Sequence, residues 1–173
     1  RVANDAGQVL QPGEPGVIEI KGPNVFKGYW RMPEKTAQEF SADGFFITGD
    51  VGVIAPDGRV SIVGRAKDLI ISGGFNIYPK EIEETLDAVE GVSETAVVGV
   101  PHPDLGEAVL AVVVRKHDAV SEESLMAAAQ STLARFKHPR RVVFVDDLPR
   151  NAMGKVQKNV LRERYKDSFY FKK

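Results

Sequence analysis

Lys155 has the clearest potential for chemistry in this chain, because it directly follows a glycine in the segment Leu-Pro-Arg-Asn-Ala-Met-Gly-Lys. A loop stiffened by Pro149 would present this lysine with little steric shielding. Its ammonium group is a compact charge with three donors on a long arm, suited to phosphate or carboxylate oxygens. The segment is not a Walker loop, since the spacing Gly-x-x-x-x-Gly-Lys-Ser/Thr is absent. Alone, a Gly-Lys pair is a weak signal.

A second candidate is Asp50, which ends the run Phe-Ile-Thr-Gly-Asp. The pattern predicts a tight turn that places a carboxylate just after an apolar, β-branched run. An ionised carboxylate can accept hydrogen bonds from two adjacent hydroxyls, such as those of a ribose. Taken alone, a Gly-Asp pair at a strand end is more often a turn or a cap.

Three charged residues, Arg65, Lys67 and Asp68, lie between two apolar runs and are followed by the paired glycines Gly73 and Gly74. Adjacent glycines allow positive φ or the close approach of another group to the backbone. A charged segment between a β region and a mixed α and β region is typical of a connection between domains. The alternative is a surface loop followed by a flexible turn.

The cysteine and histidine content of the chain does not indicate a metal site or a disulfide. The chain has no cysteine, which excludes disulfides and thiolate metal sites. Its three histidines, His102, His117 and His138, fit no metal-binding spacing. We therefore expect no metal site, and His138 beside a proline is interpreted as a turn residue.

The composition is that of a soluble globular protein, with 43% hydrophobic and 27% charged residues among 173. No apolar run approaches the roughly 20 residues that span a bilayer. The start of the chain also lacks the basic stretch and apolar core of a signal peptide. These features predict a soluble, cytoplasmic protein without a membrane span.

Charge is unevenly distributed along the chain. Residues 135–173 contain 12 Lys or Arg against 4 Asp or Glu, whereas residues 1–134 contain 11 against 20. The basic end is interpreted either as a solvated amphipathic helix or as a region that attracts phosphates. Nucleic acid is the weaker partner, because aromatic residues are not interleaved with the basic ones and no recognition motif is present.

The elements expected to position these residues change in kind near residue 64. Before it, short apolar runs alternate with turn dipeptides, which predicts a mainly β region with a helix over residues 33–40. Separate strands are expected over residues 45–47 and 51–54, on either side of the Thr-Gly-Asp turn. The turn-rich start is unusual for a domain and suggests a piece of a longer chain.

Beyond residue 68, strands alternate with amphipathic helices, which predicts a compact α+β domain. The helix over residues 79–89 starts at a proline and has an apolar face. Ser121 is expected to cap a helix with an apolar side that includes Leu125 and extends to Phe136. The other elements predicted here are strands over 69–71, 96–100, 108–114 and 142–145, and a basic helix over 158–166.

In this order and at this spacing, the segments resemble the adenylate-forming superfamily of acyl-CoA synthetases, peptide synthetase adenylation domains and luciferases. The resemblance covers essentially the whole chain. It is carried by residues 13–30 ending in Gly-Tyr-Trp, Thr-Gly-Asp at 48–50, Gly-Arg-x-Lys-Asp to Pro-x-Glu-Ile-Glu at 64–83, Gly-Val-Pro-His-Pro with Gly-Glu at 99–107, and the closing Gly-Lys.

The resemblance implies a role for each candidate that lies in these motifs. Asp50 and Arg65 match positions that bind the ribose hydroxyls of ATP and of the acyl-adenylate. Lys67 falls at the hinge about which the small C-terminal domain rotates. Lys155 matches the lysine that orients the carboxylate and stabilises charge on the α-phosphate.

The resemblance also implies a fold, an activity and cofactors. Residues 1–64 would be the β end of the large N-terminal domain, 65–68 the hinge and 69–173 the small mobile α+β domain. Gly73 and Gly74 match the turn that lines the pantetheine tunnel. ATP, Mg2+ and coenzyme A (CoA) would serve the full-length enzyme, which joins a small carboxylic acid to CoA through an acyl-adenylate.

The amino-acid sequence of the closing segment looks most like that of bacterial malonyl-CoA synthetases, which use malonate and methylmalonate. A medium- or long-chain fatty acyl-CoA ligase is the alternative within the class. The family's phosphate loop, adenine-binding strand and acyl pocket lie upstream of the motifs found here. We therefore expect this fragment alone to be inactive in ATP-pyrophosphate exchange.

Two alternatives come from other classes. The chain would act as a non-catalytic substrate or docking partner of a protein lysine acetyltransferase if Lys155 is acetylated, as this lysine is in several bacterial family members. Acetylation removes the charge on which the mechanism depends. An adenylation domain that loads a carrier protein predicts a downstream carrier segment, and residues up to 173 contain none.

Overall fold

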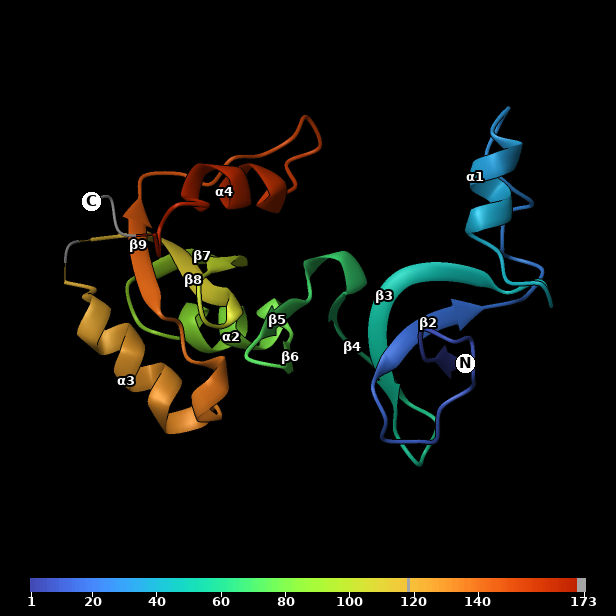
Figure 1. Ribbon diagram of the computed structural model, residues 1–173, viewed down its shortest axis with the longest axis horizontal. Helices are drawn as coiled ribbons and strands as arrows, with labels where there is room; N and C mark the ends of the chain where they lie inside the picture. Colours follow the sequence, from blue (N-terminus) through green and yellow to red (C-terminus); the bar gives the residue numbers. More distant parts are fainter. Residues whose placement is uncertain (118, 171–173) are drawn as a thin grey trace. The chain divides into compact units, whose positions relative to one another are not determined.

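Two separate β-sheets organise the chain in the computed structural model, which describes residues 1–117 and 119–170. The chain divides into two compact units, Arg1–Lys67 and Asp68–Lys173. Each unit contains one of the sheets (Figure 1).

Unit 1 is a four-stranded antiparallel sheet with the strands in chain order. It is mainly β, as expected, and few of its side chains are buried. The buried apolar residues are Val2, Ala3 and Val51. The elements are β1 (Val2–Ala3), β2 (Gly16–Ile20), α1 (Pro33–Gln38), β3 (Phe46–Ile54) and β4 (Val60–Arg65).

The prediction of two strands separated by a Thr-Gly-Asp turn was wrong, because β3 is one continuous strand. Its neighbours pair with it on both sides: Glu19 of β2 lies opposite Ile47, and Arg65 of β4 lies opposite Asp50. Gly49 adopts a φ of 71°, which a residue with a side chain rarely adopts. The unusual backbone angle at Gly49 therefore does not end the strand, because β3 remains paired with β2 and β4 on its two sides.

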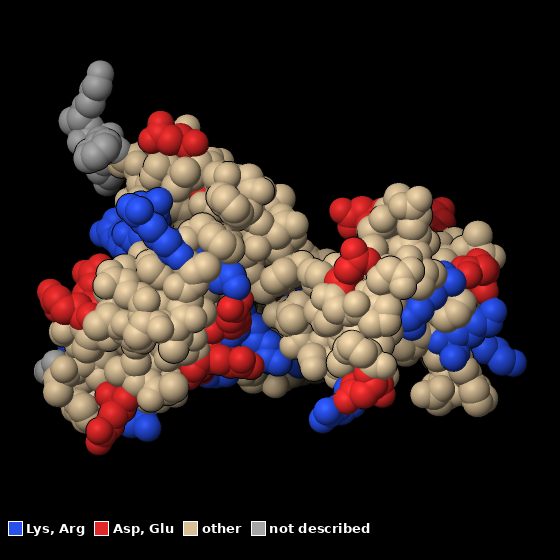
Figure 2. Space-filling view, turned by 90° about the horizontal axis from the view of Figure 1, so that it is seen from below, with Lys and Arg blue, Asp and Glu red and all other residues tan. Residues whose placement is uncertain are grey.

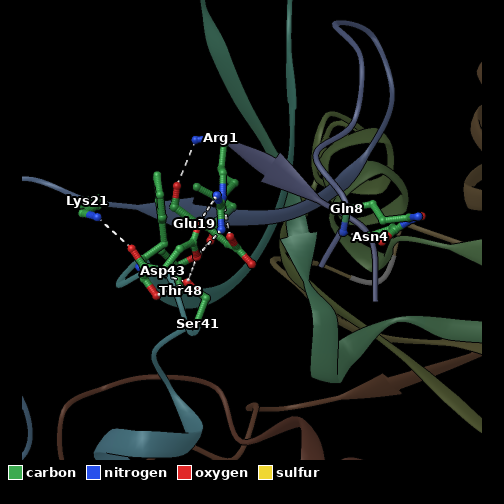
Figure 3. A network of polar contacts seen from close by, with 10 residues as sticks. Arg1, Asn4, Gln8, Glu19, Lys21, Ser41, Asp43 and Thr48 are labelled. Atoms are coloured by element: carbon green, nitrogen blue, oxygen red, sulfur yellow. Dashed lines mark hydrogen bonds and ion pairs between the residues drawn. The ribbon is translucent and has the colours of Figure 1, made fainter. Parts of the chain in front are cut away.

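A polar network ties the start of the chain to the segment before β3 (Figure 3). The Arg1 guanidinium donates to Glu19 at 2.6 Å and to both oxygens of Asp43, and it lies 3.7 Å from the centroid of the Phe45 ring. The hydrogen bonds from Arg1 and Ser41 hold the pKa of Asp43 well below its usual value. Because Glu19 is buried and charged, this ion pair satisfies a group that would otherwise be costly to bury.

Unit 2 contains a five-stranded sheet in the order β6-β5-β8-β7, with β9 added parallel to β8. Its central strand is β8, which forms a long antiparallel ladder with β7. The elements are η1 (Ala66–Asp68, which begins just before the unit), β5 (Ile70–Ser72), β6 (Phe75–Ile77), α2 (Pro79–Asp87), β7 (Val92–His102), β8 (Gly106–Arg115), α3 (Glu122–Thr132), η2 (Arg135–Lys137), β9 (Arg141–Val145) and α4 (Lys158–Tyr165).

The sheet of unit 2 is covered on both faces, and β7 and β8 are buried and apolar over residues 96–100 and 108–113. Side chains alternate between the faces of a strand. Val97 of β7 therefore packs with α2 and α3, whereas Val98 packs with Leu161 of α4. In Figure 1, α4 lies on one side of the sheet and α2 and α3 on the other. Burying Leu161 completely contributes about 1.5–3 kcal/mol. The predicted α+β domain is confirmed.

The helix predicted to continue to Phe136 ends earlier, at Thr132. Its apolar side is otherwise as expected, with Leu125 and Ala129 buried, and Ser121 caps its start. The hydroxyls of Ser131 and Thr132 both donate to the carbonyl of residue 128, and the next residue is extended. Such side-chain bonds compete with the helical backbone ladder, and Phe136 consequently lies in the short helix η2.

None of the described helices is both long and apolar enough to cross a lipid bilayer.

Candidate functional site

Asp50 and Arg65 are brought together by the pairing of β3 with β4. The two residues lie opposite each other in the ladder, and Arg65 Nε lies 2.7 Å from Asp50 Oδ1. The Thr48 hydroxyl accepts a hydrogen bond from the Asp50 amide at 3.1 Å and donates to the carbonyl of Ile18. Thr48 thus anchors the backbone that carries Asp50. The carboxylate side chain is 27% exposed, so it can reach a ligand.

A hollow of about 610 Å3 lies beside this ion pair in unit 1. Tyr29 borders the hollow, and its hydroxyl donates a hydrogen bond to Glu39 at 3.2 Å. The pKa of Tyr29 is raised, mainly because the side chain is partly buried and also because of this hydrogen bond. Phe46, which lines the hollow, packs edge to face with Phe26 and in a tilted arrangement with Phe40. The residues lining the hollow are Tyr29, Gln38, Glu39, Phe46, Ile47, Thr48, Gly49 and Arg65.

Lys67 lies in η1, the single 3-10 turn that follows β4. The two units of the chain meet in sequence directly after it, between Lys67 and Asp68. Asp68 itself is held in unit 2, where it accepts from Arg162 of α4 at 2.7 Å. One end of the connecting turn is therefore anchored by an ion pair to the helix that follows the Lys155 segment.

Gly73 and Gly74 form a two-residue hairpin turn between β5 and β6. Their φ values are 56° and 83°, the pair of positive angles that a type I′ turn requires. The Gly73 amide donates to the carbonyl of Leu105 at 2.9 Å, so the turn also touches the β7–β8 connection. β6 is not among the predicted elements, although the paired glycines were the signal for a hairpin.

A smaller hollow of about 170 Å3 opens beside Gly73. Phe75 and Phe136 stack face to face at its rim, with ring centroids 4.6 Å apart, and both rings are partly exposed. Arg140 adds a cation. We did not identify these side chains from the sequence, because they lie far apart along the chain. The full lining is Ser72, Gly73, Phe75, Leu105, Val109, Phe136, His138 and Arg140.

Lys155 sits on a loop that leaves and re-enters the core of unit 2. We call residues 149–157 the Lys155 loop; it runs between the buried side chains of Leu148 and Leu161. Arg150 and Val156 form an isolated β-bridge, and the amide of residue 157 donates to the carbonyl of residue 149. Gly154 has a φ of 76°. The loop is therefore closed at its base, and Lys155 is exposed near its tip.

The structure thus pairs Asp50 with Arg65 and places both glycines in one turn, while Lys67 and Lys155 lie on segments of their own. Among residues 1–117 and 119–170, no group of three or more His, Cys, Asp or Glu side chains is arranged to hold a metal ion. No Mg2+ ligand is assigned to these residues.

The basic C-terminal end is partly neutralised by carboxylates from the first part of unit 2. Figure 2 shows basic and acidic side chains next to one another on the face it draws. Surface pairs contribute little each, but the partly buried pair of Lys158 and Glu83 is less screened. The pairs are Lys137 with Glu81, Arg150 with Glu94, Lys158 with Glu83 and Arg162 with Asp68. Packing within the unit therefore accounts for part of the charge asymmetry.

Comparison with known proteins finds a matching domain family and a similar solved structure. Residues 81–155 match the family of AMP-binding enzyme C-terminal domains. The crystal structure of ATP-bound MatB from Rhodopseudomonas palustris is 61% identical, with a TM-score of 0.90 over 98% of this chain and 34% of that chain.

Curated relatives agree with this structural likeness. The 3-[(3aS,4S,7aS)-7a-methyl-1,5-dioxo-octahydro-1H-inden-4-yl]propanoyl:CoA ligase of Rhodococcus jostii is 48% identical over 92% of this chain and 31% of its own length. The long-chain-fatty-acid–CoA ligase FadD13 of Mycobacterium tuberculosis is 44% identical over 95% of this chain and 32% of its own. The chain spans about a third of the length of these relatives.

Proposed function

Because this chain belongs to the C-terminal part of the adenylate-forming acyl-CoA synthetase superfamily, we propose that it serves the two-step conversion of a carboxylate, ATP and CoA into acyl-CoA, AMP and pyrophosphate. The observation that carries the proposal is the Lys155 loop. An exposed lysine with a restrained backbone stands at the last residue of the segment that matches the family. The match with MatB over 98% of the chain supports the same conclusion.

In the first step, Lys155 would act on the carboxylate and the α-phosphate. Attack of a carboxylate oxygen on the α-phosphorus forms the acyl-adenylate and expels pyrophosphate. The approach brings negative charges together, so an ammonium group beside them lowers the barrier. Lys155 needs no proton transfer for this role, because its charge alone stabilises the transition state.

Unit 1 would hold the ribose of the nucleotide. The Asp50 carboxylate can accept hydrogen bonds from both ribose hydroxyls. Arg65 pairs with one carboxylate oxygen through Nε, which keeps the carboxylate oriented for that contact. Thr48 holds the backbone of Asp50 through its hydroxyl.

Unit 2 would then contribute to the second step, in which the CoA thiol attacks the acyl carbon and releases AMP. Gly73 and Gly74 lack side chains where the pantetheine arm would pass. The hollow beside Gly73 offers an aromatic pair and Arg140, which suit the base and a phosphate of CoA. We assign residues 1–64 to the large domain, 65–68 to the hinge and 69–173 to the mobile domain.

For the acyl substrate we propose malonate or methylmalonate. The identity of 61% to MatB, a malonyl-CoA synthetase, exceeds the 44% to the fatty-acid ligase, which supports this choice over a medium- or long-chain fatty acid. Full-length enzyme that carries these residues should form malonyl-CoA with a higher kcat/KM than any fatty acyl-CoA. Mass spectrometry of the thioester products from a panel of acids measures this, and preference for a fatty acid would contradict the substrate assignment.

Two further expectations concern the chain by itself. Residues 1–173 alone should catalyse neither half-reaction, because the parts of the site described here provide neither a phosphate loop nor an acyl pocket. The exposed amine of Lys155 is also open to acetylation by a protein lysine acetyltransferase, which would remove its charge.

A further inference from the structure

The peptide group between Gly154 and Lys155 is held at both of its polar atoms by side chains of the same loop. Arg150 Nη1 donates to the Gly154 carbonyl at 2.8 Å. The Lys155 amide donates to Asn151 Oδ1 at 3.0 Å. Because a peptide group is planar, fixing its oxygen and its N–H fixes the orientation of the plane. The Cα of Lys155 is attached to that plane, so its position follows.

The peptide groups before and after this one are held as well. The carbonyl of Lys155 accepts from the Asn151 amide at 3.0 Å, and the Gly154 amide donates to the Asn151 carbonyl at 2.9 Å. Thus Lys155 is fixed on both sides at the backbone, while its side chain stays exposed. Because residues 150–155 are all exposed, these hydrogen bonds, and not buried side-chain packing, hold the backbone of Lys155 in place.

Arg150 also connects the loop to the sheet of unit 2. Its Nη2 donates to both carboxylate oxygens of Glu94, on β7, the strand that forms the long ladder with β8. This ion pair raises the pKa of Arg150. One planar guanidinium therefore spans two anchors, a carboxylate on the sheet and the carbonyl that precedes Lys155. A lysine offers a single ammonium group and lacks the planar fork that bridges two fixed acceptors.

We propose that Arg150 is a positioning residue for Lys155, acting by joining Glu94 to the Gly154 carbonyl. Nothing in this role requires Arg150 to touch a substrate. The proposal rests on the function proposed above for Lys155 in adenylation. Misplacement of a catalytic group by about 1 Å can cost on the order of 100-fold in rate, so the loss of this bridge should be visible in the adenylation step.

The test uses the full-length enzyme and measures the two half-reactions separately. Arg150→Ala should lower the rate of acyl-adenylate formation about 10-fold or more, with little change in thioester formation from preformed acyl-adenylate. Arg150→Lys should recover only part of the rate. Glu94→Gln keeps an acceptor oxygen but loses the charge, and it should fall between the wild type and Arg150→Ala. Arg164→Ala, which removes an exposed arginine from α4, is the matched control and should leave both rates unchanged.

A double-mutant comparison decides whether Arg150 acts through the lysine. In a Lys155→Ala enzyme, adding Arg150→Ala should cause no further loss of adenylation. A further loss in that background, an equal loss in both half-reactions, or no loss from Arg150→Ala alone would each overturn the positioning role. If Lys155→Ala itself leaves adenylation intact, the proposed function of the lysine fails first and the positioning role with it.

Discussion

Lys155→Ala should lower the rate of acyl-adenylate formation on the order of 100-fold or more in the full-length enzyme, in the range measured when a single preorganised transition-state donor is removed. Thioester formation from preformed acyl-adenylate should change far less. The reason is that the ammonium charge is needed only while the carboxylate attacks the α-phosphorus. Single-turnover assays of pyrophosphate release and of CoA thioester formation measure the two rates independently.

Lys155→Arg is the informative companion variant, because it keeps the charge but changes its shape and reach. It should retain more adenylation activity than Lys155→Ala. Equal losses in both half-reactions for Lys155→Ala would show that the lysine supports the fold or a shared step, and the role proposed for it would be abandoned.

The second large effect is expected at the connection between the units. Proline fixes φ near −65° and restricts the residue before it, so Lys67→Pro should hinder the backbone rotation that the proposed hinge requires for the change between the two steps. Overall acyl-CoA turnover should fall sharply. At least one isolated half-reaction should be retained, since a single domain orientation remains available. Steady-state turnover compared with the two half-reactions measures this.

Lys67→Ala separates the backbone from the side chain. It removes the long side chain but leaves φ and ψ free, so it should affect turnover much less than Lys67→Pro. A Lys67→Pro enzyme with normal turnover would argue against a hinge at this position. A Lys67→Ala enzyme as impaired as Lys67→Pro would assign the effect to the side chain.

The large features of the fold could be predicted because they rest on periodic patterns. The continuous apolar, β-branched runs and the helix face of Ile82 and Leu86 predicted the α+β unit, and the burial of these residues confirms them. Elements that depend on local competition could not be predicted in the same way. The end of α3 is decided by two hydroxyls that bond back to one carbonyl, and the continuity of β3 by pairing with both neighbouring strands.

The residues of the candidate site could likewise be predicted only in part. Motifs pointed to Asp50, Arg65 and Lys155 because each lies in a short segment of recognisable order. The Arg150–Glu94 bridge joins residues 56 positions apart, and nothing in the sequence pairs these charges rather than others. To predict which side chains hold this loop, one must know the strand register of the neighbouring sheet. That register depends on the folding of the whole unit.

The most direct test of the central claim, that this chain serves acyl transfer through an acyl-adenylate, is to follow an oxygen atom. Full-length enzyme should be given malonate labelled with 18O in its carboxylates, together with ATP and CoA. Attack on the α-phosphorus and release by the thiol leave one carboxylate oxygen on the phosphate, so mass spectrometry should find 18O in AMP. Label in inorganic phosphate with ADP as the nucleotide product, or AMP without label, would contradict the account.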